Sequence, residues 1–178
     1  NGEIYNAQKL RNEELNNQNF IGYSDTEVLM RLYQKLNDKM LNKIKGMFAF
    51  LLLDKKKDEI VIVRDQFGIK PLYYYQNKDL FIFSSEIKPI IKYTNKNEIS
   101  DKSIIDYFIL GKQDYSNNTF FKDIMSVEPG TLIKIKKNIM YKKKYWDIYD
   151  KKIQNFKSSK YFFNSYKNKM DEIIDEYL

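Results

Sequence analysis

Two continuous apolar runs separated by a charged turn constrain the fold of this chain most. The runs are Met47–Leu53 and Ile60–Val63, and the turn is Asp54–Asp58. Short apolar runs of this kind are typical of strands, and the lack of alternation with polar residues indicates strands that are buried on both faces. We therefore expect an antiparallel hairpin inside a covered sheet.

Two more hairpins are expected further along the chain. One pairs Leu72–Tyr75 with Leu80–Phe83, and the other pairs Thr131–Ile135 with Met140–Tyr145 after a hinge at Pro129 and Gly130. The first four strands are predicted to form one antiparallel layer covered on both sides. Their aromatic side chains recur at strand period and are assigned to the core.

The best-defined helix begins at Ser24. Ser24 is the expected N-cap, Glu27 completes a capping box, and Tyr23 is expected to pack against Val28 as a hydrophobic staple. Apolar residues then recur at helical spacing, with an interruption, as far as Ile44. Other helices are predicted at Ala7–Leu15, Ile87–Ile91 and Ser103–Leu110, and from Ser158 to the end of the chain.

Composition excludes several kinds of site. The chain has 178 residues, enough for one domain with a core and part of a second. With no cysteine it has neither disulfides nor a thiol nucleophile, and with no histidine it lacks the commonest general base. The longest apolar stretch is too short to span a membrane. A cytoplasmic location is compatible with this composition.

The positive charge has a simple interpretation. The net charge of +7 comes mainly from scattered lysines, which suggests a solvated coat. A nucleic-acid surface around Lys142–Lys144, Tyr145, Trp146, Lys151 and Lys152 was the alternative. Interspersed acidic residues and the lack of a recognised nucleic-acid-binding fold argue against it, so no nucleic-acid partner is expected.

The first two residues suggest half of an amide-hydrolysing site. An Asn-Gly step can aim a carboxamide N–H of Asn1 and the backbone N–H of Gly2 at one developing oxyanion. Donors alone do not attack a carbonyl, so the nucleophile is missing. The chain has no initiator methionine and begins in what resembles the end of a strand, and we expect the true N-terminus to lie upstream.

Five blocks in order carry a family resemblance: Asn1–Asn6, Ser24–Val28, Gly46–Phe50, Arg64–Tyr74 and Ser84–Lys88. Together they resemble the glutaminase domain of glutamine-hydrolysing asparagine synthetases, which are class II amidotransferases. The resemblance implies an α+β fold, the four-layer αββα sandwich of N-terminal nucleophile hydrolases, incomplete at its start. Residues 1–147 would be the C-terminal two-thirds of that domain, and 148–178 a linker and first helix leading to a missing synthetase domain.

The resemblance also assigns site residues. Asn1 and Gly2 would form the oxyanion hole and contact glutamine, and Gly2 would let the backbone approach the substrate closely. Glu3 and Asp25 would accept the α-ammonium of glutamine. The family's cysteine nucleophile and the arginine that binds the substrate carboxylate precede Asn1, so the fragment alone is expected to be inactive.

Other polar residues are interpreted as structural. Arg64, Asp65, Gly68 and Pro71 are expected to form an architectural corner that supports the site. Glu86, at the start of a helix, is given the same role. No metal or cofactor is expected in this portion, whereas the missing synthetase domain would use ATP and Mg²⁺.

The implied enzyme hydrolyses glutamine and passes ammonia to the synthetase domain, where aspartate or a related acceptor is amidated. A homodimer is one option for its assembly. Two alternatives stay open: a degenerate glutaminase domain that serves only for docking or regulation, and another class II amidotransferase such as one that amidates a sugar. The site that selects the acceptor is expected in the synthetase domain, outside these residues.

Overall fold

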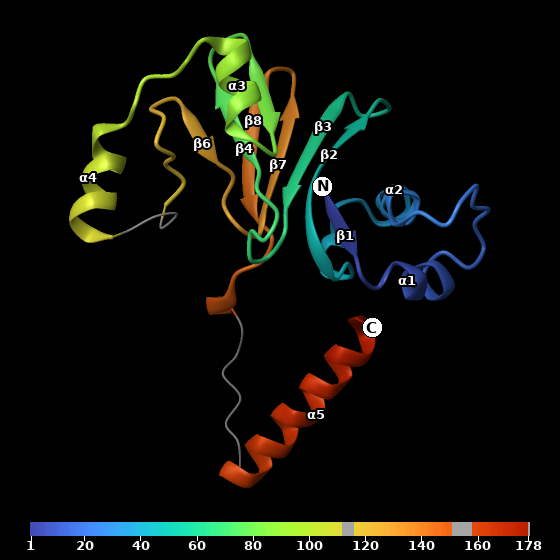
Figure 1. Cartoon of the computed structure of the whole chain (residues 1–178). Coiled ribbons are helices and arrows are strands. Elements are labelled where there is room, and N and C mark those ends of the chain that lie inside the picture. The colour runs from blue at the N-terminus through green and yellow to red at the C-terminus, as the bar shows by residue number, and fades with distance from the viewer. Residues whose placement is uncertain (112–115, 151–157, 178) are drawn as a thin grey trace. The chain divides into compact units, whose positions relative to one another are not determined.

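The chain divides into two compact units. The computed structural model describes residues 1–111, 116–150 and 158–177 (Figure 1). The first unit contains Asn1–Gly2 and Met47–Trp146, and the second contains Glu3–Gly46 and Asp147–Leu178. The predictions that fall on Lys151, Lys152 and Leu178 lie outside the described residues.

The strands form two antiparallel sheets. In the larger sheet the order is β1 (Gly2–Ile4), β2 (Gly46–Asp54), β3 (Glu59–Arg64), β7 (Thr131–Lys136) and β8 (Ile139–Lys144). In the smaller sheet the order is β5 (Phe81–Ser84), β4 (Tyr73–Gln76) and β6 (Ile124–Ser126). All three predicted hairpins are confirmed, because β2 pairs with β3, β4 with β5, and β7 with β8.

The prediction that the first four strands form one layer is wrong. Strands β2 and β3 belong to the larger sheet, and β4 and β5 to the smaller. The chain leaves the first sheet at Asp65 and turns through Gly68, whose φ of +66° suits a glycine. Strand β4 then pairs with β5 on one side and β6 on the other, so a strand distant in sequence completes the second sheet.

The core of the first unit has two parts. One cluster contains side chains from both sheets: Ala49, Ile62, Leu72, Tyr74, Val127, Ile133 and Ile135. A second cluster joins Tyr75 and Ile124 of the smaller sheet to Ile90 of helix α3 (Ile87–Thr94). This unit is therefore layered as sheet, sheet and helix (Figure 1). It also contains helix α4 (Asp101–Leu110), which Ser100 caps.

The prediction that both faces of the strand are buried is confirmed for β3. It is wrong for the second half of β2, where one face is exposed. Val61, Ile62 and Val63 are all buried, and because consecutive side chains point to opposite faces, both faces of β3 are covered. In β2 the side chains of Leu51 and Leu53 are 53% and 56% exposed. Alternate residues of a strand share a face, so both leucines continue the face of Ala49 beyond the buried cluster.

The second unit is mainly helical. It contains α1 (Ala7–Glu13), α2 (Asp25–Leu36), η1 (Asn37–Asn42), η2 (Ile148–Asp150) and α5 (Ser159–Tyr177). The helix predicted to continue to Ile44 ends at Leu36, because Asn37 takes a φ of +50°. The 3-10 turn that follows still buries Met40 and Leu41, which explains why the apolar spacing resembled one longer helix. None of the described helices is both long and apolar enough to cross a membrane.

Two isoleucines of the β7–β8 hairpin give a matched test of the core. Ile133 has no exposed surface, whereas Ile139 is 52% exposed. Ile133→Ala should lower the free energy of unfolding by about 2–5 kcal/mol, because it removes buried methyl groups and leaves a cavity. Ile139→Ala should lower it by less than about 1 kcal/mol. Urea denaturation measures both, and equal losses would contradict the assigned core.

Candidate functional site

Asn1 is held by the backbone of β2. Its nitrogen donates a hydrogen bond to the carbonyl of Ala49 (3.1 Å), and its carbonyl accepts one from the Ala49 N–H (2.8 Å). Two residues that exchange both bonds form the hydrogen-bonded pair of an antiparallel ladder. The backbone position of Asn1 is thus fixed, while its side chain is exposed.

Gly2 lies against β2 so closely that no side chain fits. A Cβ atom built on Gly2 would stand 2.1 Å from the Met47 carbonyl oxygen and 2.7 Å from the Phe48 Cα. Its φ of +131° also disfavours any L-residue with a side chain. The structure therefore gives a reason for this glycine that the sequence did not: the neighbouring strand occupies the space.

The ladder pattern fixes the direction of the Gly2 N–H. Asn1 and Ala49 form a hydrogen-bonded pair, so the next residue, Gly2, occupies a non-hydrogen-bonded position. The N–H of such a residue points away from the partner strand. Strand β1 is at the edge of the larger sheet. Among the described residues the Asn1 carboxamide forms no hydrogen bond either, so two donors are open to a ligand.

In the second unit, Asp25 connects β1 to the start of α2. The Ile4 N–H donates to Asp25 Oδ2 (3.0 Å), and the Thr26 hydroxyl lies 3.4 Å from Asp25 Oδ1. Asp25 is half-buried, whereas the Glu3 side chain is exposed. One Asp25 oxygen therefore has a structural bond, and the other keeps acceptor capacity.

The start of α2 differs in detail from the predicted capping box. Ser24 is the N-cap as predicted, and its side chain accepts from the Thr26 N–H (3.1 Å). Glu27 instead reaches further back and accepts from the N–H groups of Ile21 (3.0 Å) and Gly22 (2.9 Å). Both bonds lower the pKa of Glu27, and the bond from Ile21 has the larger effect. The prediction that Tyr23 packs against Val28 as a hydrophobic staple is wrong, because Tyr23 is 93% exposed.

The corner after β3 is built around Asp65, which has no exposed surface. Its carboxylate accepts four backbone N–H groups, from Phe48 (3.3 Å), Phe67 (3.1 Å), Ile69 (2.9 Å) and Lys70 (2.9 Å). Buried charge is tolerated when hydrogen bonds replace its hydration. The predicted supporting corner is therefore present, although the sequence did not show how directly it contacts β2.

Arg64 closes the same corner from the other side. Its guanidinium donates to the carbonyls of Lys70 (2.9 Å), Gly68 (2.8 Å) and Val127 (2.5 Å) and to the hydroxyl of Ser126 (2.8 Å). The Tyr145 hydroxyl donates to the Arg64 carbonyl (3.0 Å). Burial, with a smaller effect of the Asp65 charge, raises the pKa of Tyr145, so this phenol stays a donor at physiological pH.

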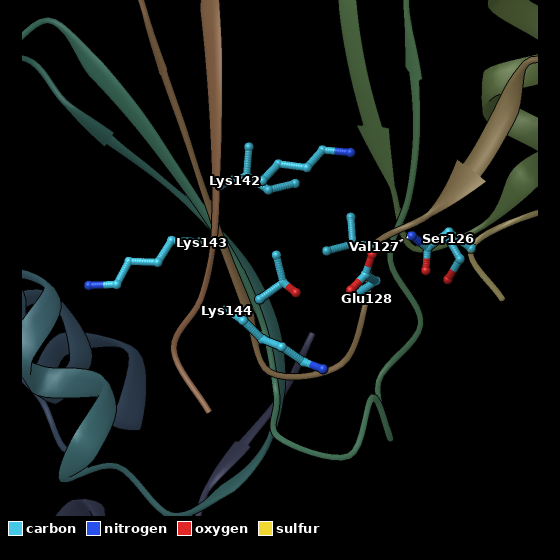
Figure 2. A pocket seen from close by; sticks show the side chains of 9 residues that line it. Ser126, Val127, Glu128, Lys142, Lys143 and Lys144 are labelled. Carbon is cyan, nitrogen blue, oxygen red and sulfur yellow. Dashed lines mark hydrogen bonds between the residues drawn. The ribbon is translucent and has the colours of Figure 1, made fainter. Parts of the chain in front are cut away.

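A cavity of about 90 Å³ lies elsewhere in the first unit, and Figure 2 shows side chains that line it. Lys142 and Lys144 extend toward it from alternate positions of β8, and Lys143 extends the other way. Lys142 donates to the Tyr74 hydroxyl, and Glu128 accepts from Asn117 (2.5 Å). Small-molecule sites typically measure about 300–1,000 Å³, so we assign no substrate to this cavity. Nor does any cluster of three or more carboxylates in the described ranges suit a metal ion.

Solved structures define the class of fold. The chain resembles the allosteric regulatory enzyme of purine biosynthesis, with a TM-score of 0.56 and 22% identity over 82% of this chain and 27% of that one. It also resembles the Bacillus subtilis glutamine phosphoribosylpyrophosphate amidotransferase, with a TM-score of 0.55, 22% identity, and coverage of 82% and 28%. The expected α+β fold is confirmed, because the chain shares it with these two solved structures.

Sequence comparison defines the family. The model of the glutamine amidotransferase domain matches residues 1–146, and the chain belongs to this family. One relative is the Methanocaldococcus jannaschii protein named "Putative asparagine synthetase [glutamine-hydrolyzing] 2", 38% identical over 96% of this chain and 35% of its own length. Asparagine synthetase [glutamine-hydrolyzing] 2 of Bacillus subtilis is 34% identical over 84% of this chain and 21% of its own length. The chain thus spans about a third or less of these relatives.

The fit of Gly2 against β2 can be tested with two glycines. Gly2→Ala should lower the free energy of unfolding by about 2 kcal/mol or more, because the new Cβ meets backbone atoms at a strained φ. Gly22→Ala is the control, since its Cβ would approach only Glu27 Oε2 at 3.9 Å, and it should change stability by less than about 0.5 kcal/mol. Thermal and urea denaturation measure both variants. Equal stabilities would show that β1 does not lie this close to β2.

Proposed function

We propose that this chain is the glutaminase portion of an asparagine-synthetase-like enzyme and helps to hydrolyse glutamine to glutamate and ammonia. One observation carries the proposal: the Gly2 N–H and the Asn1 carboxamide are open to a ligand, on a backbone that Ala49 holds in place. The family match over residues 1–146 supports the same activity.

In the proposed reaction this chain stabilises negative charge. A thiolate, supplied by the cysteine that the family carries before these residues, attacks the carboxamide carbon of glutamine. The carbonyl oxygen becomes an oxyanion, which accepts hydrogen bonds from Asn1 and Gly2. The C–N bond then breaks, the leaving nitrogen takes up the proton that the thiol lost and departs as ammonia, and a thioester remains. Water attacks the thioester through a second oxyanion in the same hole, the C–S bond breaks, and glutamate and the free thiol are released.

The proposal places the α-ammonium of glutamine at carboxylates. Asp25 keeps acceptor capacity on Oδ1, and the Glu3 carboxylate is exposed to solvent. An ammonium needs acceptors when it leaves water, and hydrogen bonds between charged groups are the strongest available. Both side chains are therefore proposed as substrate contacts, and the bond from Ile4 to Asp25 would hold that carboxylate in place.

The remaining steps are proposed from the resemblance to asparagine synthetases. Ammonia would pass to a synthetase domain that uses ATP and Mg²⁺ to amidate aspartate or a related acceptor. Residues 148–178 would be the linker and first helix toward that domain, and this portion would itself bind no cofactor. We propose a cytoplasmic enzyme, with a homodimer as one assembly and with neither nucleic acid nor membrane as a partner.

Asn1→Ala tests the oxyanion hole in the protein translated from the complete reading frame. Losing one donor to an oxyanion should lower kcat for glutamine hydrolysis by about a hundredfold. Asn12→Ala is the control, because Asn12 is an exposed asparagine whose side chain bonds only to Gln8 (3.2 Å) among the recorded contacts. It should leave kcat unchanged. Similar kcat values for Asn1→Ala and wild type would remove Asn1 from the reaction.

Asp25→Asn separates substrate binding from structure. The asparagine keeps an acceptor for the Ile4 N–H, so thermal stability should stay near that of wild type. It loses the negative charge, so the KM for glutamine should rise about tenfold, the cost of one charged hydrogen bond. Asp25→Ala should lose both the binding and the stability. An unchanged KM in Asp25→Asn would leave Asp25 with a structural role alone.

A further inference from the structure

We propose that Asp65 is a positioning residue for the oxyanion hole, acting through β2 rather than on the substrate. The proposal rests on the proposed function of Asn1 and Gly2. Every contact that carries it lies within the first unit.

The first link joins Asp65 to Phe48. Extending the β2–β3 register, in which Ala49 faces Arg64, places Phe48 opposite Asp65. In a regular antiparallel pair the two residues would exchange N–H to carbonyl bonds. Here the Asp65 N–H does donate to the Phe48 carbonyl (2.8 Å), but the Phe48 N–H donates to the Asp65 carboxylate instead (3.3 Å).

The side chain of Asp65 therefore stands in for its own carbonyl in the ladder. That carbonyl is free to accept from Gly68 (3.1 Å) and Gly130 (2.8 Å). A single residue thereby ends the β2–β3 ladder, closes the turn that follows β3 and fixes the turn before β7. Because the carboxylate is fully buried, no water competes for these donors.

The second link joins this part of β2 to the two oxyanion donors. Ala49, the residue after Phe48, exchanges both backbone hydrogen bonds with Asn1. Phe48 itself lies opposite Gly2, with its Cα 2.7 Å from where a Gly2 Cβ would be. Any displacement of Phe48 is therefore passed directly to the backbone that aims both donors, and oxyanion stabilisation depends steeply on donor position.

Asp65→Asn changes this arrangement with little change in size. In the Asp65 carboxylate, Oδ2 accepts from the N–H groups of Phe48 and Lys70, and Oδ1 accepts from those of Phe67 and Ile69. A carboxamide has only one oxygen to accept hydrogen bonds. In either orientation an NH₂ group faces backbone donors. The ladder at Phe48 or the turn that supports it must then open.

The matched control is Tyr145→Phe. It also removes a partly buried hydrogen bond in the same corner, the one to the Arg64 carbonyl (3.0 Å), but this bond involves neither Phe48 nor the Asp65 carboxylate. It should lower stability without moving β1. Comparing the two variants separates a general loss of stability from a loss of position.

Two measurements on the protein from the complete reading frame test the proposal. Hydrogen–deuterium exchange of the Ala49 amide, which bonds to Asn1, should accelerate in Asp65→Asn relative to the Ile133 amide, and should not do so in Tyr145→Phe. Glutaminase kinetics should show kcat lowered about tenfold or more in Asp65→Asn, with KM changed by less than about threefold. If Asp65→Asn does not fold, Asp65→Glu moves the carboxylate by one methylene and takes its place.

Unchanged exchange at Ala49 in Asp65→Asn would overturn the proposal. A faster Ala49 amide with an unchanged kcat would also overturn it, as would equal losses of kcat in both variants. A wild-type protein without glutaminase activity would instead contradict the proposed function. The exchange data would still decide whether Asp65 holds Ala49 and Asn1 together.

Discussion

A buried carboxylate holds the first unit together at the point where the chain passes from one sheet to the other. Asp65 carries a charge with no access to solvent, and such a charge is tolerable only while its four N–H partners stay in place. The two strands β2 and β3, the turn to residue 70 and the turn at Gly130 must therefore form together. On the opposite side, the Arg64 guanidinium donates to backbone carbonyls and to a hydroxyl. Asp65 thus pairs with the N–H groups of the corner and Arg64 with its carbonyls.

The sequence predicted the hairpins well because local signals define them. Continuous apolar runs, the polar turns between them and the cap at Ser24 act over a few residues, and each is present in the structure. The arrangement of strands into sheets depends on contacts distant in sequence, and it was predicted wrongly. No local pattern shows that β4 pairs with β6, some fifty residues later, instead of extending the β2–β3 sheet. The exposure of Leu51 and Leu53 has the same cause, since burial of a strand face depends on what covers it.

The candidate site divides in the same way. The Asn1–Gly2 step and the charge of Asp25 could be identified from the sequence through the resemblance to a family. The sequence also indicated the supporting corner around Asp65, but it did not show which backbone groups hold Asn1 and Gly2. Ala49 contributes only backbone atoms to the clamp on Asn1, and the Met47 carbonyl excludes a side chain at Gly2. Backbone groups leave little trace in a sequence, so the residues in direct contact with Asn1 and Gly2 are apolar ones that would otherwise be assigned to the core.

The last strand of the larger sheet carries three consecutive lysines, Lys142–Lys144, at an edge that no further strand covers in the described part of the chain. A free sheet edge offers unpaired N–H and carbonyl groups to any other extended segment, and charged side chains discourage such pairing. To add a strand there, an incoming peptide would have to bury or displace several ammonium groups. The lysines of β8 therefore disfavour the addition of a further strand at this edge.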